Sequence, residues 1–117
     1  MQFSEAIRSS DAQETAQNTE GILNIDYHSL KKSALILRSL NHKLRQQILK
    51  IINEDNKITV TEIYVKLRLE QSVASQHLAI LRKAGIVSTQ REGKFIYYTI
   101  NAPRIDAIQK FVKELVG

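Results

Sequence analysis

The chain has 117 residues, no cysteine and a formal net charge of +5. This length suits one domain, and the lack of cysteine excludes disulfides, thiolate metal sites and thiol-based sensing. No apolar run approaches the roughly 20 residues that a membrane span needs and none in residues 2–26 resembles a signal peptide, so we expect a cytoplasmic protein.

The charge is unevenly distributed. Residues 1–26 have one arginine against five acidic residues and are rich in Ser, Gln, Thr and Asn, so we expect a polar acidic N-terminal tail. Residues 27–117 hold the positive balance and form the predicted domain. A basic domain favours polyanions such as nucleic acid or an anionic membrane surface.

Helical spacing begins at Tyr27. Leu30 and Leu37 recur at a helical interval and predict a first helix over Tyr27–Leu40. Asn41 is expected to end this helix and to cap a second one over 42–53. The polar segment 53–57 predicts a loop, followed by a short strand at 57–59.

A capping box predicts the third helix. Thr59 and Glu62 have the T-x-x-E spacing in which each residue satisfies the other's backbone amide, so a short helix is expected over about 60–68. After a turn, a fourth helix is predicted over 71–84. Gly85 suits the left-handed position that ends it.

The period then changes from 3.6 to 2. Two strands are predicted at Ile86–Arg91 and Lys94–Ile100, joined by a three-residue loop with Gly93 in the left-handed position. Pro103 opens a last helix. This order predicts a mainly α (α+β) winged helix-turn-helix with about five helices and a β-hairpin wing.

The fourth helix presents two contrasting faces. Ala74, Leu78 and Leu81 share an inward stripe, whereas small hydroxyl and amide side chains share the opposite one. Short hydroxyls allow close approach to DNA, and a glutamine can pair with adenine in the major groove. We therefore predict that Ser72, Ser75 and Gln76 face bases. The free backbone N–H groups of the first turn, where Ser72 lies, favour a phosphate, and Gln71 is placed to assist. The alternative is a solvated face with chance small residues.

The predicted hairpin tip carries Arg91 and Lys94 around Gly93. Cations at this point suit contact with the DNA backbone or the minor groove. A hairpin tip kept soluble by charge is the alternative interpretation.

The segment "QSVASQHLAILRKAGIVSTQREGKFIYYTI", with "LRQQIL" upstream, resembles the ArsR/SmtB family of bacterial winged-helix repressors. The resemblance spans about residues 30–115. It implies a homodimer joined through the first and last helices, one recognition helix per subunit, and repression by covering a promoter. His77 matches the histidine of the family pattern and is expected to assist DNA binding or to pack on the inner seam. The matching positions are Leu69, Gln71, Ser72, Ser75, His77, Leu78, Leu81, Ala84, Gly85, Ile86, Val87, Arg91, Gly93, Lys94, Tyr97 and Tyr98, together with Arg45, Ile48 and Leu49.

A dimer also follows from the apolar stripes of the first and last helices. Together they exceed what one small domain can cover, and exposed apolar patches usually mark interfaces. The alternative is that both stripes pack on each other within one subunit. The predicted interface consists of Leu30, Leu37, Ile105, Ile108, Val112 and Leu115.

Two metal-site patterns of the resembled family are missing. Where relatives carry Cys-x-Cys-Asp, this chain reads Thr59-Val60-Thr61-Glu62, and its last helix has no histidine. Asp26 and His28 would supply only two ligands, whereas zinc takes three or four from protein. We therefore predict no metal and no cofactor. Two departures weaken the turn: Glu70 replaces a Ser or Thr cap, and Arg68 stands where Gly or Asn is usual.

The chain has no phosphate loop, nucleophile elbow or metalloprotease motif, so an enzyme is not predicted. We predict a sequence-specific transcriptional regulator, a dimeric repressor that binds double-stranded DNA at an inverted-repeat operator. The alternative is a winged-helix module for protein or RNA contacts. In that case Tyr64 is the exposed aromatic residue expected to contact a partner.

Overall fold

The computed structural model describes residues 23–117. Most of the predicted tail therefore lies outside the described residues, and 23–26 precede the first helix without regular structure. The chain divides into two units, residues 1–33 and 34–117. In the first, the carboxylate of Asp26 accepts hydrogen bonds from the backbone N–H and hydroxyl of Ser29, at 3.1 and 2.7 Å. These bonds lower the pKa of Asp26 and cap the helix that follows.

Helix α1 (Tyr27–Leu40) is followed closely by α2 (Lys43–Asp55). The predicted cap at Asn41 is wrong. His42 is the N-cap residue, and its Nδ1 accepts a hydrogen bond from the backbone N–H of Leu44 at 3.2 Å. An imidazole acceptor can replace the usual hydroxyl because the position requires only a lone pair within reach.

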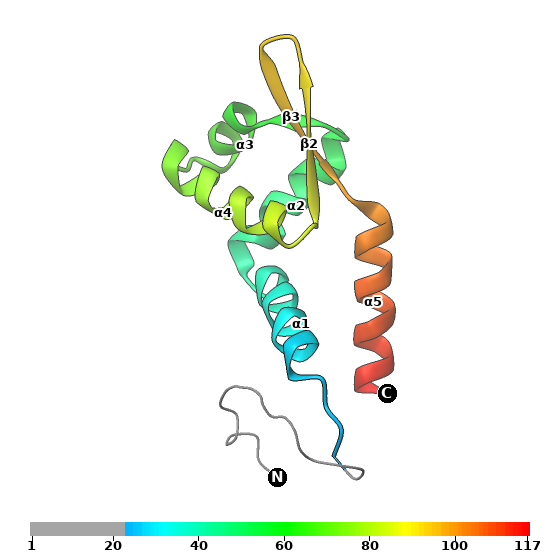
Figure 1. Cartoon of the computed structure of the whole chain (residues 1–117). Coiled ribbons are helices and arrows are strands. Elements are labelled where there is room, and N and C mark those ends of the chain that lie inside the picture. Colours follow the sequence, from blue (N-terminus) through cyan, green and yellow to red (C-terminus); the bar gives the residue numbers. More distant parts are fainter. Residues whose placement is uncertain (1–22) are drawn as a thin grey trace. The chain divides into compact units, whose positions relative to one another are not determined.

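Helices α3 (Val60–Leu67) and α4 (Gln71–Lys83) form the predicted helix-turn-helix and pack against each other (Figure 1). The capping box of α3 is confirmed, with Glu62 and Thr59 bonded in both directions. Arg68 ends α3 in a left-handed conformation at φ 56°, which explains why Gly or Asn would suit this position better. Gly85 ends α4 at φ 78°, as predicted.

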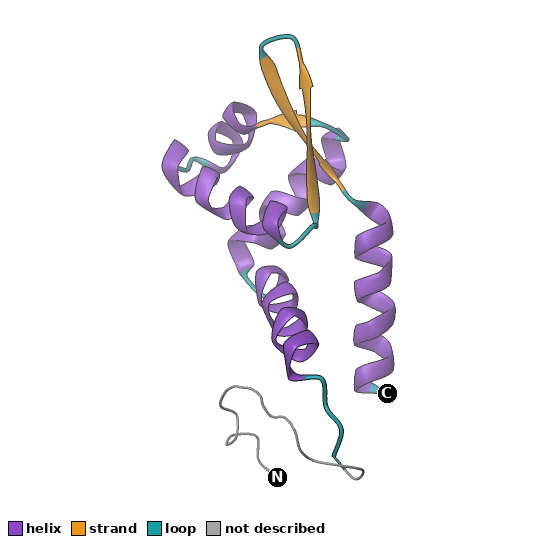
Figure 2. Cartoon of the chain, in the orientation of Figure 1, coloured by secondary structure: helices purple, strands orange, loops and turns teal. Residues whose placement is uncertain are grey.

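The wing belongs to a three-stranded antiparallel sheet (Figure 2). The strands are β1 (Ile58–Thr59), β2 (Val87–Glu92) and β3 (Phe95–Ile100), in the order β1-β3-β2. Because Glu92 pairs with Phe95, only two residues form the turn, and the predicted three-residue loop is wrong. Gly93 is the first of them at φ 63°, the position that a type II′ turn gives to glycine.

The core lies where α2, α3, α4 and the base of the sheet meet. Its centre is a cluster of eight buried residues: Ile48, Ile52, Ile58, Ile63, Leu78, Leu81, Ile86 and Val87. Helix α5 (Ala102–Val116) begins after Asn101, with Pro103 in its first turn as predicted. Its Ile105 and Ile108 pack against this cluster. Over residues 23–117, five helices and a three-stranded sheet confirm the winged helix-turn-helix prediction.

Candidate nucleic-acid interface

Helix α4 separates its two faces as its sequence predicts. Ala74, Leu78 and Leu81 are fully buried, which fixes the helix against the core. The opposite face consists of exposed side chains: Gln71, Ser72, Ser75, Gln76, Ala79 and Lys83. We call these six residues the recognition stripe. Its short side chains allow close approach to DNA, and its hydroxyl and amide groups can form hydrogen bonds there. The stripe contains no carboxylate, so it does not repel phosphate.

The N-terminus of α4 has an unusual cap. Glu70 occupies the N-cap position, and its side chain makes no capping hydrogen bond. Backbone N–H groups in the first turn of a helix have no intrahelical acceptor. Those beside Gln71 and Ser72 can therefore donate to an anion, which the helix dipole also favours.

His77 lies apart from the recognition stripe. It is half-buried, and its Nδ1 is 3.1 Å from Nη1 of Arg45 on α2. Its ring also lies against His42, with the centroids 4.9 Å apart. Burial, followed by the charges of His42 and Arg45, lowers the pKa of His77. Because an arginine can only donate, Nδ1 accepts and His77 is neutral.

Arg45 connects this histidine to the end of α1. Its side chain is buried, at 7% exposure. Its Nε donates to the carbonyl of Ser39 at 2.6 Å, and its Nη2 to the carbonyl of Arg38 at 3.2 Å. The guanidinium therefore joins the carboxyl end of α1, the start of α2 and the middle of α4.

Arg91 and Lys94 are both exposed at the wing tip. The neighbouring acid, Glu92, is bound by Lys57 at 2.7 Å, and this hydrogen bond is the main cause that raises the pKa of Lys57. Lys57 also lies over the ring of Tyr97, 4.9 Å from its centroid. Glu92 is thus neutralised locally, and the two tip cations supply the positive charge there.

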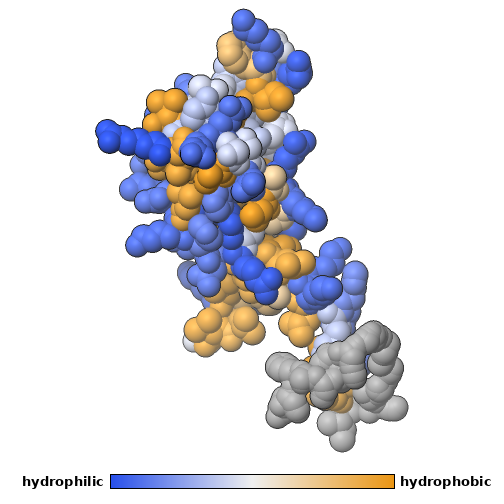
Figure 3. Space-filling view, turned by 90° about the vertical axis from the view of Figure 1, so that its left-hand side faces the viewer, coloured by the Kyte–Doolittle hydropathy of each residue, from blue (hydrophilic) through white to orange (hydrophobic). Residues whose placement is uncertain are grey.

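Phe95 and Ile96 at the wing tip were missed by the sequence analysis. They are 51% and 45% exposed, beside the two cations. Figure 3 shows apolar and strongly hydrophilic side chains together at the upper end of the molecule, where the wing lies. The sequence signal for these exposed residues is the run FIYYTI, in which polar and apolar residues do not alternate. Because successive side chains point to opposite faces of a strand, such a run exposes apolar side chains where a hairpin is covered on one face at most.

Tyr64 does not have the exposure that the protein-contact alternative requires. It is half-buried on α3, whereas the neighbouring Val65 is 62% exposed. Exposed aromatic residues in the described part of the chain are Tyr27, Phe95 and Phe111. The expectation of an exposed aromatic anchor at Tyr64 is therefore wrong.

The predicted interface residues of α5 differ in exposure. Ile105 and Ile108 are partly covered by the core, whereas Val112 and Leu115 are 37% and 67% exposed. On α1, Leu37 is half-buried and Leu30 is 49% exposed. Apolar side chains thus remain open to solvent on both helices.

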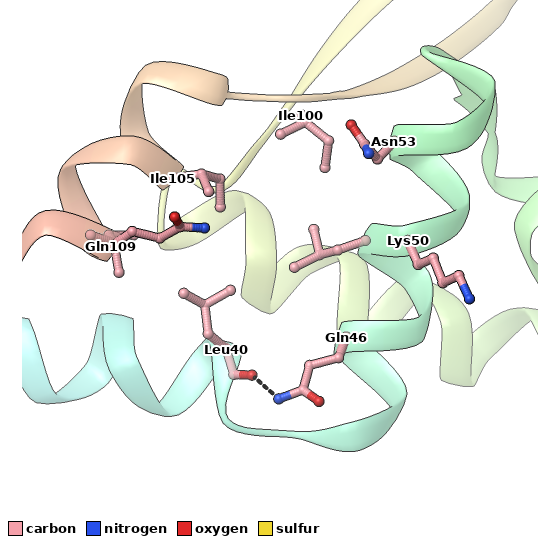
Figure 4. Close-up of a pocket in the computed structure, with 9 residues that line it drawn as sticks. Leu40, Gln46, Lys50, Asn53, Ile100, Ile105 and Gln109 are labelled. Carbon is pink, nitrogen blue, oxygen red and sulfur yellow. Dashed lines mark hydrogen bonds between the residues drawn. The ribbon is translucent and has the colours of Figure 1, made fainter. Parts of the chain in front are cut away.

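A pocket of about 410 Å³ lies between α2, β3 and α5 (Figure 4). Its apolar lining consists of Leu40, Leu49, Ile100, Ile105 and Ile108. Gln46, at its edge, donates to the carbonyl of Leu40 at 2.9 Å. The pocket therefore lies against the first two turns of α5, on the side of that helix that faces α2.

Residues 23–117 contain neither a cluster of metal ligands nor a helix that could span a membrane. No three His, Asp or Glu side chains in this range lie together as a metal site would require. Every helix in the same range is too short or too polar to cross a bilayer.

Comparison with known proteins links these features to regulators. Residues 42–89 match the family described as bacterial regulatory protein, arsR family. The chain is 34% identical over 91 residues to the transcriptional repressor PagR of Bacillus anthracis, covering 78% of this chain and 91% of PagR. It is also 34% identical over 84 residues to the transcriptional activator HlyU of Vibrio cholerae, covering 72% of this chain and 77% of HlyU.

Solved structures extend the likeness to the fold. The crystal structure of PagR gives a TM-score of 0.60 at 34% identity and covers 74% of this chain and 99% of that chain. The crystal structure of NolR from Sinorhizobium fredii gives a TM-score of 0.64 at 30% identity and covers 80% of this chain and 90% of that chain. The similarity therefore reaches well beyond the segment that contains the recognition stripe.

Proposed function

This chain belongs to the arsR family of bacterial regulatory proteins, and from that premise we propose that it is a homodimeric repressor of an inverted-repeat operator. As a member, it is a DNA-binding transcription regulator and not an enzyme. Named relatives include both a repressor and an activator. Repression is proposed because a dimer that covers a promoter needs no further contact surface to block transcription.

The recognition stripe of α4 is the observation that carries the proposal. Ser72, Ser75 and Gln76 are exposed on a helix whose other face is fully buried, so the helix can enter a major groove as a rigid unit. We assign these three residues to bases. Gln76 suits adenine N6 and N7, and the two serines suit either bases or phosphates.

Backbone contacts would come from two separate places. Gln71 and the open first turn of α4 suit one phosphate, supported by the absence of a side-chain cap from Glu70. Arg91 and Lys94 suit the backbone beside the wing, supported by the pairing of Glu92 with Lys57. His77 assists indirectly, because its bond to Arg45 holds α4 on α2.

We propose that the first and last helices form the dimer interface. Leu30, Val112 and Leu115 are exposed apolar residues that a partner helix would cover. Leu37, Ile105 and Ile108 would complete the interface from their half-buried positions. Two recognition helices related by a two-fold axis would then read half-sites about 34 Å apart, one turn of DNA.

The proposal includes no metal and no cofactor. This sequence has Thr59-Val60-Thr61-Glu62 in place of the family's cysteine pattern and no histidine on its last helix, so both ligand sets of the family are incomplete. Control by protein concentration or by a small effector is compatible with the same DNA-binding geometry.

Selection from a random duplex pool at near-physiological salt tests the function. Enrichment of an inverted repeat with half-sites about one turn apart is expected. Binding without a consensus that disappears as salt rises would contradict the proposal, because it would reflect phosphate attraction alone.

Gln76→Ala tests the base-reading role on the selected site. It should cost roughly 1–3 kcal/mol there and relax the preference at one position. Gln109→Ala, an exposed glutamine on α5, is the matched control. An equal loss on every sequence would exclude Gln76 from base reading.

A further inference from the structure

The carboxyl end of α4 is hydrogen-bonded to the beginning of α5. Arg104 donates from Nε and Nη2 to the carbonyl of Ala84, at 3.2 and 3.1 Å. Asn101 donates from Nδ2 to the carbonyl of Gly85 at 2.9 Å, and its backbone N–H donates to the carbonyl of Ile86, also at 2.9 Å. Residues 15 to 20 positions apart are thus joined where α4 turns into β2.

Of the carbonyls bound here, that of Ala84 is one that a helix end leaves without an intrahelical partner. Ala84 is the C-cap residue of α4, and Gly85 follows it in the left-handed conformation. A cation beside the last carbonyls also interacts favourably with the helix dipole. A Cβ on Gly85 would lie 3.2 Å from Nε of Arg104, so the glycine also leaves room for the guanidinium.

The Asn101 side chain forms hydrogen bonds both with α5 and with the end of α4. Its Oδ1 accepts from the backbone N–H of Arg104 at 3.3 Å and so caps α5, while its Nδ2 holds Gly85. The two roles need different atoms of one amide. An aspartate would keep the acceptor and lose the donor, which separates capping from the link to α4.

We propose that Asn101 and Arg104 are positioning residues for DNA recognition, which fix the direction of α4 relative to α5. Neither lies on the recognition stripe. The inference rests on the proposed function, in which α5 joins the protomers and α4 reads the bases. Because each recognition helix is then oriented from the dimer helix, this link sets the distance between the two helices and therefore the half-site spacing that the dimer accepts.

Both residues lie at the start of α5, because Asn101 is its N-cap residue and Arg104 is in its first turn. Ile105, the next residue along the helix, packs against the core. A shift of α5 would be transmitted by these bonds, since carbonyl groups at a helix end move with the helix.

Asn101→Asp and Arg104→Ala test the inference by fluorescence anisotropy. Three duplexes are compared: the selected operator, the same half-sites with two base pairs added between them, and an unrelated sequence. The wild-type protein should bind the selected operator much more tightly than the other two duplexes. Both variants should bind the operator with about tenfold lower affinity, a change of a size known for residues outside the ligand surface. They should also distinguish less between the two half-site spacings. Their affinity for the unrelated duplex should not change.

Controls separate positioning from folding and from charge. Lys110→Ala removes one exposed cation from the same helix and should leave all three affinities unchanged. Arg104→Lys, which keeps the charge and can give one bond to Ala84, should recover part of the loss. Melting temperature and sedimentation of each variant establish that the dimer remains folded.

The possible results lead to different conclusions. Loss of operator affinity with loss of spacing preference in a folded dimer supports the inference. Wild-type spacing preference in both variants overturns it, as does an equal loss on all three duplexes. A wild type that prefers no sequence would instead overturn the proposed function, and that result requires no variant.

Discussion

Arg45→Met should destabilise the domain although it removes no apolar contact. Arg45 is 7% exposed and binds three groups from two other helices. Methionine retains much of the hydrocarbon volume but cannot donate. The carbonyl of Ser39, a residue only 3% exposed, would lose its 2.6 Å partner.

The size of this effect follows from those contacts. A hydrogen bond to a charged group contributes roughly 1.5–3 kcal/mol. The bond to the Ser39 carbonyl should contribute nearly this full amount because it is buried. The bond to the Arg38 carbonyl should contribute less, because that carbonyl also accepts from the backbone N–H of Asn41 at 3.2 Å. We therefore expect the free energy of unfolding to fall by about 2–4 kcal/mol.

Urea denaturation at one fixed protein concentration measures this change, because stability of an oligomer depends on concentration. Lys43→Met, an exposed substitution on the same helix, should change stability by less than about 0.5 kcal/mol. A loss below about 1 kcal/mol for Arg45→Met would refute the reasoning, since it would mean that water replaces the guanidinium without cost.

Four further outcomes are expected. Leu115→Glu should shift the dimer towards monomer in sedimentation experiments, and an unchanged dimer would remove this part of α5 from the interface. Lys94→Ala should weaken all DNA alike and reduce the salt slope by about one, whereas a sequence-dependent loss would indicate a base contact. Because folding lowers the pKa of His77, the unfolded chain binds the proton more tightly, so stability should fall as the pH drops below the usual value of 6.5 and through the lowered pKa. His77→Gln should flatten that part of the pH profile relative to the wild type, and an unaltered profile would assign the titration elsewhere. Leu78→Ala should cost about 2–5 kcal/mol in urea denaturation, and a smaller loss would show that the site collapses around the cavity.

Local signals in the sequence located the helices and the wing. The capping box at Thr59, the left-handed glycines and the inward stripe of α4 each depend on residues within one or two turns of each other. Such patterns can be predicted because the interacting groups are close along the chain. The family pattern added the recognition helix and the wing as a unit, and membership was then shown by comparison.

Predictions that depended on exact geometry were less successful. The cap of α2 is His42 and not Asn41, and the wing turn has two residues instead of three. A shift of one residue changes neither periodicity nor composition, so the sequence alone did not distinguish these arrangements. Tyr64 was expected to be exposed, but its burial depends on the packing of α3, which propensity does not fix.

The sequence by itself determined which elements form, where most of them end, and which face of α4 is polar. Tertiary structure alone decided which distant groups meet. Arg45 reaches His77 across 32 positions, and Asn101 and Arg104 reach Gly85 and Ala84 across 16 and 20. No local pattern contains these pairs, because hydrogen bonds between helices depend on how the core orients them. The apolar stripes oriented the helices, and only in that packed arrangement did the polar groups that connect recognition to the rest of the molecule come within bonding distance.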